Sequence, residues 1–291
     1  MPDFLPSSFA VIAKTDNPDA RNLGQILHNW LREQGLRSWL GFHDGGGALY
    51  TAVPQADLAL VLGGDGTFVS VTRTLMGRDI PLAGVNFGRV GFLSRIEPSA
   101  WKEFFAALLA GRLSLESRLA LTWKHFREDR LLASGWAVND ALLSRREPAR
   151  LIALRLAVND NPLMDLRADG VILATPTGSS GYAHSAGGPL LFPSLPVYAA
   201  VAVCPYLSAF SPLVLEGQTR LRLTVEKGNL ALILDGQEVH ALQQGDGIEI
   251  HGVPGAFRVV EMEMNSYFTK LRALGFIREE RVAGSGQTEK G

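Results

Sequence analysis

The residues best suited to chemistry form a short glycine-rich segment that contains one carboxylate. An apolar run at 58–62 breaks into Gly-Gly-Asp-Gly-Thr at 63–67, after which an apolar pattern resumes. Glycines let the backbone approach a ligand closely, and the N–H groups of such a turn and of the helix after it point at a common anion site. A carboxylate repels phosphate, so Asp65 makes sense if it holds Mg²⁺ or takes a proton from an attacking hydroxyl. The segment therefore predicts phosphoryl transfer, although a glycine turn without a ligand has the same composition.

A second group of polar side chains follows an apolar, strand-like run at 171–174. Residues 175–190 are dense in glycine and hydroxyl groups, which suit a ligand with many hydroxyls, such as a sugar or a nucleoside. The ring of Tyr182 can stack on a base. The alternative is a serine-rich helix cap, in which Thr177 or Ser179 accepts from the first N–H groups of a helix.

Four further residues lie in or next to apolar runs, and each has both a ligand-binding and a structural interpretation. Asn139 and Asp140 interrupt a strand-like pattern; a buried polar pair needs partners, which a ligand, a β-bulge or a sheet end would explain. Asp169 either accepts from a ribose hydroxyl or an amide, or belongs to an Asp-Gly turn. Phe92, in a glycine loop at 86–93, either packs in the core or lines a cleft that this loop shares with the first glycine segment at the carboxyl edge of a parallel sheet.

The composition excludes several classes of protein. The chain has 291 residues, of which 46% are hydrophobic and 20% charged, and this is enough for two domains with sizeable cores. A formal net charge of −1 gives no global basic field for nucleic acid or an anionic membrane. The single cysteine, Cys204, excludes an intramolecular disulfide, and no apolar run approaches the roughly 18–20 residues of a membrane span. Because the N-terminus also lacks signal-peptide features, we expect a cytoplasmic protein.

The segments that must position these residues change in character along the chain. From 1 to 117, strand-like and helix-like segments alternate, which predicts an α/β domain with a parallel, Rossmann-like sheet. From 118 to 264, short β-like segments follow one another and predict a mostly antiparallel domain. Residues 265–278 include the spacing of a helix, and 279–291 lack apolar anchors, so we expect a disordered tail.

Within these domains the hydrophobic pattern predicts individual elements. Asn17 and Pro18 are suited to begin a helix as its cap and its first residue. The expected strands of the first domain are 9–13, 36–42, 58–62 and 80–85, with further helices at 67–76 and 98–110. The expected strands of the second domain are 119–126, 131–144, 151–158, 163–175, 198–204, 219–226, 230–234, 247–251 and 256–264.

Together, these motifs resemble those of NAD kinases, and they keep the family's order and spacing over about residues 57–237. The matching pieces are 63–67, 86–92, 139–140, 167–170, 175–182, 185–189 and 235–237. The resemblance implies an α/β N-terminal domain and a β-rich, β-sandwich-like C-terminal domain, with the final helix returning to the first. It also implies transfer of the γ-phosphoryl group of ATP, with Mg²⁺, to the 2′-hydroxyl of the adenosine ribose of NAD to give NADP, by a homodimer or homotetramer.

The resemblance further implies roles for individual residues. Asp65 looks like the proton acceptor or the metal-orienting carboxylate, and no other side chain is implied as a direct ligand of the metal. The residues that would face the transferring phosphates are Gly63, Gly64, Gly66 and Thr67. The implied NAD contacts are Asp65, Gly66, Phe92, Asn139, Asp140, Arg150, Arg167, Asp169, Thr177, Ser180, Gly181, Tyr182, Ala183, His184, Ser185 and Gln237.

Two departures from the family's pattern fall within this set. Asp140 stands where the family commonly has glutamate, and the shorter acid reaches less far toward a ribose. Ala183 stands where the family often has asparagine, which removes one side-chain contact. Neither departure touches Asp65.

Three other functions share part of this pattern. Diacylglycerol-type lipid kinases also carry Gly-Gly-Asp-Gly-Thr, but they usually continue with a Gly-Thr-Gly-Asn-Asp loop where this chain has Gly-Val-Asn-Phe-Gly-Arg at 84–89. A 6-phosphofructokinase-like enzyme is more distant, and a catalytically silent NAD-binding sensor would not need Asp65. The sequence leaves open whether ATP, another triphosphate or polyphosphate is the donor, and whether NAD or NADH is preferred.

Overall fold

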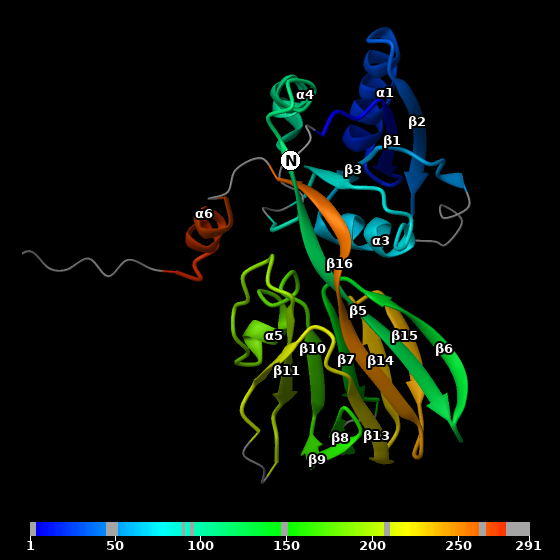
Figure 1. Ribbon diagram of the computed structural model, residues 1–291, viewed down its shortest axis with the longest axis vertical. Helices are drawn as coiled ribbons and strands as arrows, with labels where there is room; N and C mark the ends of the chain where they lie inside the picture. Colours follow the sequence, from blue (N-terminus) through cyan, green and yellow to red (C-terminus); the bar gives the residue numbers. More distant parts are fainter. Residues whose placement is uncertain are drawn as a thin grey trace, which may run out of the picture.

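Two long strands connect the two units of the molecule in the computed structural model (Figure 1). β5 (Ser114–Arg127) and β16 (Gly247–Glu261) pair antiparallel along nearly their whole length. The domain boundary expected between residues 117 and 118 lies inside β5, so this strand belongs to both units. The structure describes residues 4–44, 52–88, 91–93, 96–146, 151–206, 210–261 and 266–277, and the tail expected to be disordered lies outside them.

A parallel sheet with helices on both faces forms the first unit, as the alternating pattern predicts. Its strands lie in the order β2-β1-β3-β4, and Val259 of β16 pairs with Leu82 of β4 to continue the same sheet. Asn17 caps α1 as predicted, because its Oδ1 accepts a hydrogen bond of 2.9 Å from the N–H of Ala20. The elements are β1 (Ser8–Lys14), α1 (Pro18–Glu33), β2 (Arg37–His43), β3 (Leu58–Gly63), α3 (Asp65–Thr74), β4 (Leu82–Asn86), η1 (Pro98–Ala100) and α4 (Trp101–Leu109).

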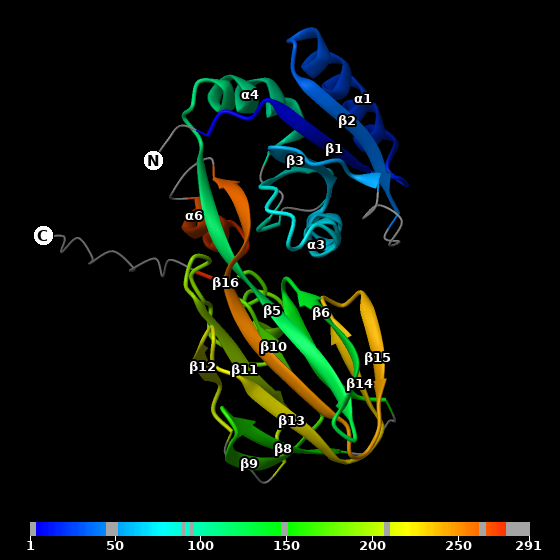
Figure 2. The ribbon, with the colours of Figure 1, turned by 45° about the vertical axis from the view of Figure 1, so that its right-hand side comes forward.

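The two faces of the parallel sheet carry different helices. The apolar side chains of α1 and α4 pack on one face, and those of α3 pack on the other. Figures 1 and 2 show that α3 lies on the side of the sheet that faces the second unit. The glycine segment at the start of α3 is therefore held close to the β-rich unit.

Antiparallel strands in two sheets form the second unit, again as predicted. One layer continues the large sheet through β16, β13, β8 and β9, with β5 and β6 alongside, and the other layer has the order β12-β11-β10-β7-β14-β15. Its remaining elements are β6 (Arg130–Ala137), β7 (Asp140–Arg145), β8 (Ile152–Val158), β9 (Asn161–Ala168), β10 (Gly170–Ala174), α5 (Tyr182–Ser185), β11 (Val197–Val203), β12 (Leu213–Glu216), β13 (Leu221–Lys227), β14 (Leu230–Leu234), β15 (Glu238–Leu242) and α6 (Ser266–Ala273).

Within two of the expected strands, the chain passes from one sheet to the other at a polar position. Val138 and Asn139 separate β6 from β7, and Asp169 separates β9 from β10; in each case the two strands belong to different sheets. The continuous strands expected at 131–144 and 163–175 are therefore wrong. Each run is largely apolar on both sides of its switch, so hydrophobicity alone does not reveal the change of partner.

Other strand predictions differ in detail. The two strands expected at 247–251 and 256–264 are the single strand β16, which shifts register between Val253 and Phe257. The pattern missed β12 and β15, which lie at opposite ends of the smaller sheet. Such edge strands pack on one side only, so their apolar signal is weak.

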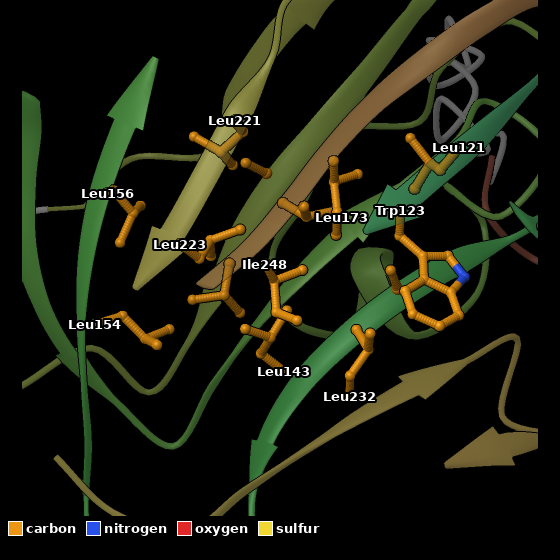
Figure 3. Close-up of a cluster of buried hydrophobic side chains, with 14 of the residues drawn as sticks. Leu121, Trp123, Leu143, Leu154, Leu156, Leu173, Leu221, Leu223, Leu232 and Ile248 are labelled. Atoms are coloured by element: carbon orange, nitrogen blue, oxygen red, sulfur yellow. The ribbon is translucent and has the colours of Figure 1, made fainter. Parts of the chain in front are cut away.

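The largest core lies between the two sheets of the second unit (Figure 3). Leu121, Trp123 and Ile248 from one sheet meet Leu143 and Leu173 from the other, and all five are at most 2% exposed. Facing sheets that bury alternate side chains in this way form a sandwich. Of the helices in the described part of the chain, none has the length and apolar character that crossing a membrane requires.

Replacing Leu143 with alanine tests the contribution of this core. Leu143 is fully buried at the centre of β7, and we expect Leu143→Ala to lower the free energy of unfolding by about 2–5 kcal/mol in urea titrations. Leu131→Ala, at a half-exposed site on β6, is the control and should cost less than about 1 kcal/mol. Equal losses in the two variants would contradict the placement of the core.

Candidate active site

The glycine segment lies at the carboxyl edge of the parallel sheet. β3 ends at Gly63, and α3 begins at Asp65 with Gly64 as its cap. The loop after β4 lies beside this turn, because the N–H of Phe87 donates to the carbonyl oxygen of Gly63 at 3.1 Å. The first turn of a helix leaves backbone N–H groups without intrahelical acceptors, and its positive dipole end favours an anion. The turn is thus arranged to receive phosphate.

Two cavities open on different sides of this turn. The larger has a volume of about 660 Å³ and is lined by Gly64, Gly66 and Thr67. The smaller, of about 370 Å³, is lined by Asp65 and by the Asn139 region of the second unit. Neighbouring residues of one turn therefore face two separate spaces, with the carboxylate on the second. This arrangement suits two ligands that react across the turn.

Backbone amides hold the Asp65 side chain. Its Oδ2 accepts from the N–H of Phe92 at 2.7 Å, and its Oδ1 accepts from the N–H of Leu93 at 3.2 Å. A Cβ atom on Gly91 would lie 2.2 Å from Oδ2, so only glycine allows the loop to approach this closely. The carboxylate is therefore oriented by main-chain groups, with its position set by the loop at 91–93.

Helix α6 supports that loop. Lys270 donates from Nζ to the carbonyl oxygen of Gly91 at 2.6 Å, and the ring of Tyr267 lies 6.0 Å from that of Phe92. The hydroxyl of Tyr267 also donates to the carbonyl oxygen of Leu191 in the second unit. The final helix therefore contacts both units, next to the smaller cavity.

The segment after β10 forms one wall of the smaller cavity. The Thr175 hydroxyl donates to the carbonyl oxygen of Val138 at 2.7 Å and accepts from the N–H of Gly178 at 3.1 Å. A Cβ on Gly178 would lie 2.2 Å from the carbonyl oxygen of Asn139, so this position requires glycine. The segment at 175–178 is thereby fixed against the first sheet switch.

The helix-cap interpretation of this segment is wrong. The cap of α5 is Gly181, which makes no side-chain capping bond. Ser179 instead donates to the carbonyl oxygen of Pro176 and accepts from the N–H of Leu191, so its hydroxyl holds the loop together.

Two buried polar atoms of the smaller cavity have no hydrogen-bond partner among the described residues. They are Oδ1 of Asn139 and Oγ1 of Thr177. Buried polar atoms are nearly always paired, and a bound ligand is one explanation for an exception in a residue that lines a cavity. The smaller cavity therefore has the properties of a binding site for a molecule that offers hydroxyl or amide groups.

Comparison with known proteins decides the family. The model of the ATP-NAD kinase N-terminal domain matches residues 48–113, and that of the ATP-NAD kinase C-terminal domain matches 138–262. The chain belongs to the ATP-NAD kinase family. The NAD kinase of Nitratidesulfovibrio vulgaris (strain DSM 19637 / Miyazaki F) is 41% identical over 276 residues, which are 94% of this chain and 98% of that protein. The NAD kinase of Oleidesulfovibrio alaskensis is also 41% identical, over 94% of each chain.

Two solved structures share the fold of this ATP-NAD kinase family member. Yeast NADH kinase, crystallised with NADH, superposes with a TM-score of 0.82 at 24% identity, over 96% of this chain and 91% of the other. An NAD kinase from Archaeoglobus fulgidus in complex with ATP superposes with a TM-score of 0.70 at 26% identity, over 92% of this chain and 100% of the other. The α/β unit followed by a β-rich unit, as expected from the sequence, is thus the fold of these kinases.

Several residues that the family resemblance implied lie at the smaller cavity. Its lining includes Asp65, Phe92, Asn139, Asp140, Thr177, Ser180 and Gly181. Tyr182, Ala183, His184 and Ser185 follow as the short helix α5. Within α5, Tyr182 is half-exposed, and the ring of His184 lies 4.9 Å from that of Phe276, which lines the cavity.

Other implied residues lie elsewhere. Gln237 lines the larger cavity and donates from Nε2 to the carbonyl oxygen of Gly66 at 2.9 Å. Asp169 forms an ion pair with Arg145 at 2.8 Å, and the guanidinium group of Arg167 lies over the ring of Tyr206. Arg167 and Asp169 line neither cavity. Both precede β10, and it is the opposite end of this strand that leads to the smaller cavity. Arg150 is outside the described residues.

The sequence motifs do not include several residues that line the larger cavity. Lys14 and His43 are the last residues of β1 and β2, and both line this space. Nε2 of His43 lies 2.8 Å from Oγ of Ser70, and burial lowers the pKa of the imidazole. The rule that ligands gather at the carboxyl ends of parallel strands would have indicated both residues.

Burial raises the pKa of two carboxyl groups, of which Asp140 lines the smaller cavity. Burial, and secondarily the charge of Asp235, raises the pKa of Asp140 to about 7. Burial also raises the pKa of Asp235, although backbone N–H groups and Arg73 oppose this. The Asp140 carboxyl therefore changes its protonation near neutral pH in the folded protein.

Asp140→Asn tests this electrostatic environment. An unfolded chain loses the Asp140 proton near pH 3.8, whereas the folded chain keeps it up to about pH 7. The wild type should therefore lose stability relative to Asp140→Asn as pH rises from about 4 to about 7, by at most about 1.4 kcal/mol for each pH unit. Urea titrations of both proteins across this range measure the difference. A difference that does not change with pH would contradict the raised pKa.

Proposed function

We propose that this chain is an NAD kinase, which transfers the γ-phosphoryl group of ATP to the 2′-hydroxyl of the adenosine ribose of NAD and releases NADP. One observation carries the proposal: a single glycine turn presents Gly64, Gly66 and Thr67 to one cavity and Asp65 to another. The donor occupies the larger cavity and the acceptor the smaller. The reacting hydroxyl then meets the γ-phosphate at the turn.

The larger cavity suits a nucleoside triphosphate. Its volume of about 660 Å³ lies in the range of small-molecule sites. The backbone N–H groups at the start of α3 receive the phosphates, and the lining contains the cation of Lys14. The solved Archaeoglobus fulgidus relative with ATP supports this donor.

The smaller cavity suits the sugar of a dinucleotide. Asn139 Oδ1 accepts from a hydroxyl, and the Thr177 hydroxyl both donates and accepts. These are the atoms that lack protein partners, so NAD would satisfy them on binding. Asp140 lines the same cavity and, one methylene group shorter than the family's usual glutamate, reaches less far toward a ribose hydroxyl.

Asp65 performs the proton transfer in this mechanism. Its carboxylate accepts the proton of the 2′-hydroxyl as the oxygen attacks the γ-phosphorus, while the bond from that phosphorus to the β,γ-bridging oxygen breaks and ADP leaves. The amides of Phe92 and Leu93 keep the carboxylate in place. Most of the rate enhancement comes from alignment of the two substrates and neutralisation of phosphate charge. The turn at 63–67 supplies this alignment through main-chain groups.

Mg²⁺ fits this site as a companion of ATP. The described residues contain no group of three or more histidine, cysteine, aspartate or glutamate side chains suited to a metal ion. Magnesium at phosphoryl-transfer sites is held mainly by substrate phosphates and water. Asp65 is the side chain that would hold it. When bound, the cation neutralises charge on the phosphates.

The proposal also covers the cellular location and the oligomeric state of the enzyme. We place the enzyme in the cytoplasm, where its exposed thiol at Cys204 stays reduced. We also expect a homodimer or homotetramer, by resemblance to the family. Light scattering on the purified protein measures the oligomeric state.

One assay tests the function directly. Purified protein is incubated with NAD, Mg²⁺ and ATP, and NADP is detected with an NADP-specific dehydrogenase. Parallel reactions with polyphosphate in place of ATP, and with NADH in place of NAD, resolve the donor and the acceptor. NAD binding without any NADP formation would indicate a catalytically silent NAD-binding sensor and would overturn the proposal.

Asp65→Asn should remove turnover and keep binding. We expect kcat to fall by at least about a hundredfold, while the dissociation constant for NAD stays within a few-fold of the wild type. Asp57→Asn is the matched control, because this carboxylate also accepts backbone N–H bonds, from Ser7 and Ser8, but at the opposite end of β3. Near-normal kcat in Asp65→Asn would reject the catalytic role.

Thr177→Val should weaken NAD binding without loss of stability. The Thr177 hydroxyl has no partner within the described protein, so its removal costs the folded chain little. The KM for NAD should rise about five- to tenfold, the worth of one hydrogen bond. Thr175→Val is the control: its hydroxyl makes two protein bonds, so this variant should lose stability. An unchanged KM in Thr177→Val would place this hydroxyl outside the binding site.

A further inference from the structure

A buried ion pair joins α3 to the β-rich unit, between the two cavities. Nη1 of Arg73 lies 2.9 Å from Oδ2 of Asp235, with the two side chains 17% and 0% exposed. Arg73 is in the last turn of α3, and Asp235 is in the turn between β14 and β15. The pair therefore links the helix that begins with the glycine turn to the unit that carries the acceptor cavity.

The Asp235 carboxylate also fixes the first sheet switch. Its Oδ1 accepts from the N–H groups of Val138 at 3.0 Å, Asn139 at 2.7 Å and Asp140 at 3.2 Å. In return, the N–H of Asp235 donates to the carbonyl oxygen of Asp140 at 2.9 Å. One buried carboxylate thus determines the backbone path of Asn139 and Asp140, which both line the acceptor cavity.

Arg73 reaches the donor side through Gln237. Its Nη2 donates to Oε1 of Gln237 at 3.2 Å, and Nε2 of Gln237 donates to the carbonyl oxygen of Gly66 at 2.9 Å. Gly66 and Arg73 are two helical turns apart on one face of α3, and a long helical side chain leans toward the N-terminus. Arg73, Asp235 and Gln237, which we call the clasp, therefore connect the glycine turn to Asn139 and Asp140.

The turn that carries the clasp has an unusual backbone. Asp235 has φ 53° and Gly236 has φ 66°, which is the left-handed conformation of a tight two-residue hairpin turn. A non-glycine residue in this region is uncommon, although aspartate tolerates it better than most. This conformation directs the Asp235 side chain back toward the sheet switch, where its hydrogen bonds are made.

We propose that Arg73 and Asp235 are positioning residues, which hold the donor turn and the acceptor segment at the separation that phosphoryl transfer requires. This inference rests on the proposed function. Neither residue needs to touch the reacting atoms. Misplacement of bound reactants by about 1 Å can cost about a hundredfold in rate. Loss of the Arg73 link should therefore affect turnover more than the binding of either substrate.

A second buried aspartate provides a matched control. The Asp246 side chain is also 0% exposed, and it accepts from Nε of Arg127 at 2.7 Å and from the N–H of Gln243 at 3.0 Å. His125 lies 2.9 Å from it. This network resembles the clasp in chemistry but lines neither cavity. Asp246→Asn therefore reports what the loss of a buried carboxylate does to the fold alone.

Steady-state kinetics of Arg73 variants test the inference. In Arg73→Met, kcat should fall about 10- to 100-fold while the KM values for ATP and NAD stay within about threefold of the wild type. Arg73→Lys keeps the charge beside Asp235 and should retain kcat within about tenfold. Asp246→Asn should keep kcat within about twofold at a temperature where it is folded. A kcat within twofold in Arg73→Met, or equal losses in Arg73→Met and Asp246→Asn, would overturn the positioning role.

Hydrogen exchange separates failure of the clasp from failure of the function. The amides of Val138, Asn139 and Asp140 should exchange at least fivefold faster in Arg73→Met, although Arg73 lies in the other unit, and faster still in Asp235→Asn. If the wild type forms no NADP, the proposed function fails, and this measurement still decides whether the clasp couples the two segments. Unchanged exchange in both variants would overturn the clasp.

Discussion

The antiparallel pairing of β5 with β16 is the constraint on which the rest of the structure depends. The backbone hydrogen bonds of a sheet fix register strongly, because a slip by one residue would turn every buried side chain outward. β16 meets the parallel strands through Val259 and Leu82, and at its other end it forms one layer of the sandwich. The glycine turn of α3 and the sheet switch at Asn139 are brought together by this shared strand pair.

Three aspartates gather at that junction, and their surroundings give them different behaviour. Asp65 accepts from two main-chain amides in a loop that α6 supports. Asp235 is fully buried and accepts from three amides and from Arg73. At Asp140, N–H groups and cations offset the cost of burying the charge less than they do at Asp235, and burial raises its pKa. One residue type thus supplies the proposed proton acceptor, the proposed positioning group and a carboxyl group whose pKa burial raises to about 7.

The hydroxyl-rich segment after β10 shows the same division of roles. The hydroxyls of Thr175 and Ser179 form hydrogen bonds within the protein, and each both donates to and accepts from backbone groups. Thr177, between them, keeps a buried hydroxyl without a partner in the described chain. Hydroxyls with protein partners and a hydroxyl without one therefore alternate within five residues, and composition does not tell them apart.

Local sequence determined the elements that depend on local physics. The cap at Asn17, the glycine turn at the start of α3 and the alternation that gives a parallel sheet follow from residue types and spacing within a few positions. The motifs of this ATP-NAD kinase family member also indicated most residues that now line the smaller cavity. Tertiary structure decided the sheet switches at Asn139 and Asp169, the division of one turn between two cavities, and the partner of Arg73. These depend on which distant strand satisfies a buried backbone or charged group, and a hydrophobic pattern records that a residue is buried but not what it is buried against.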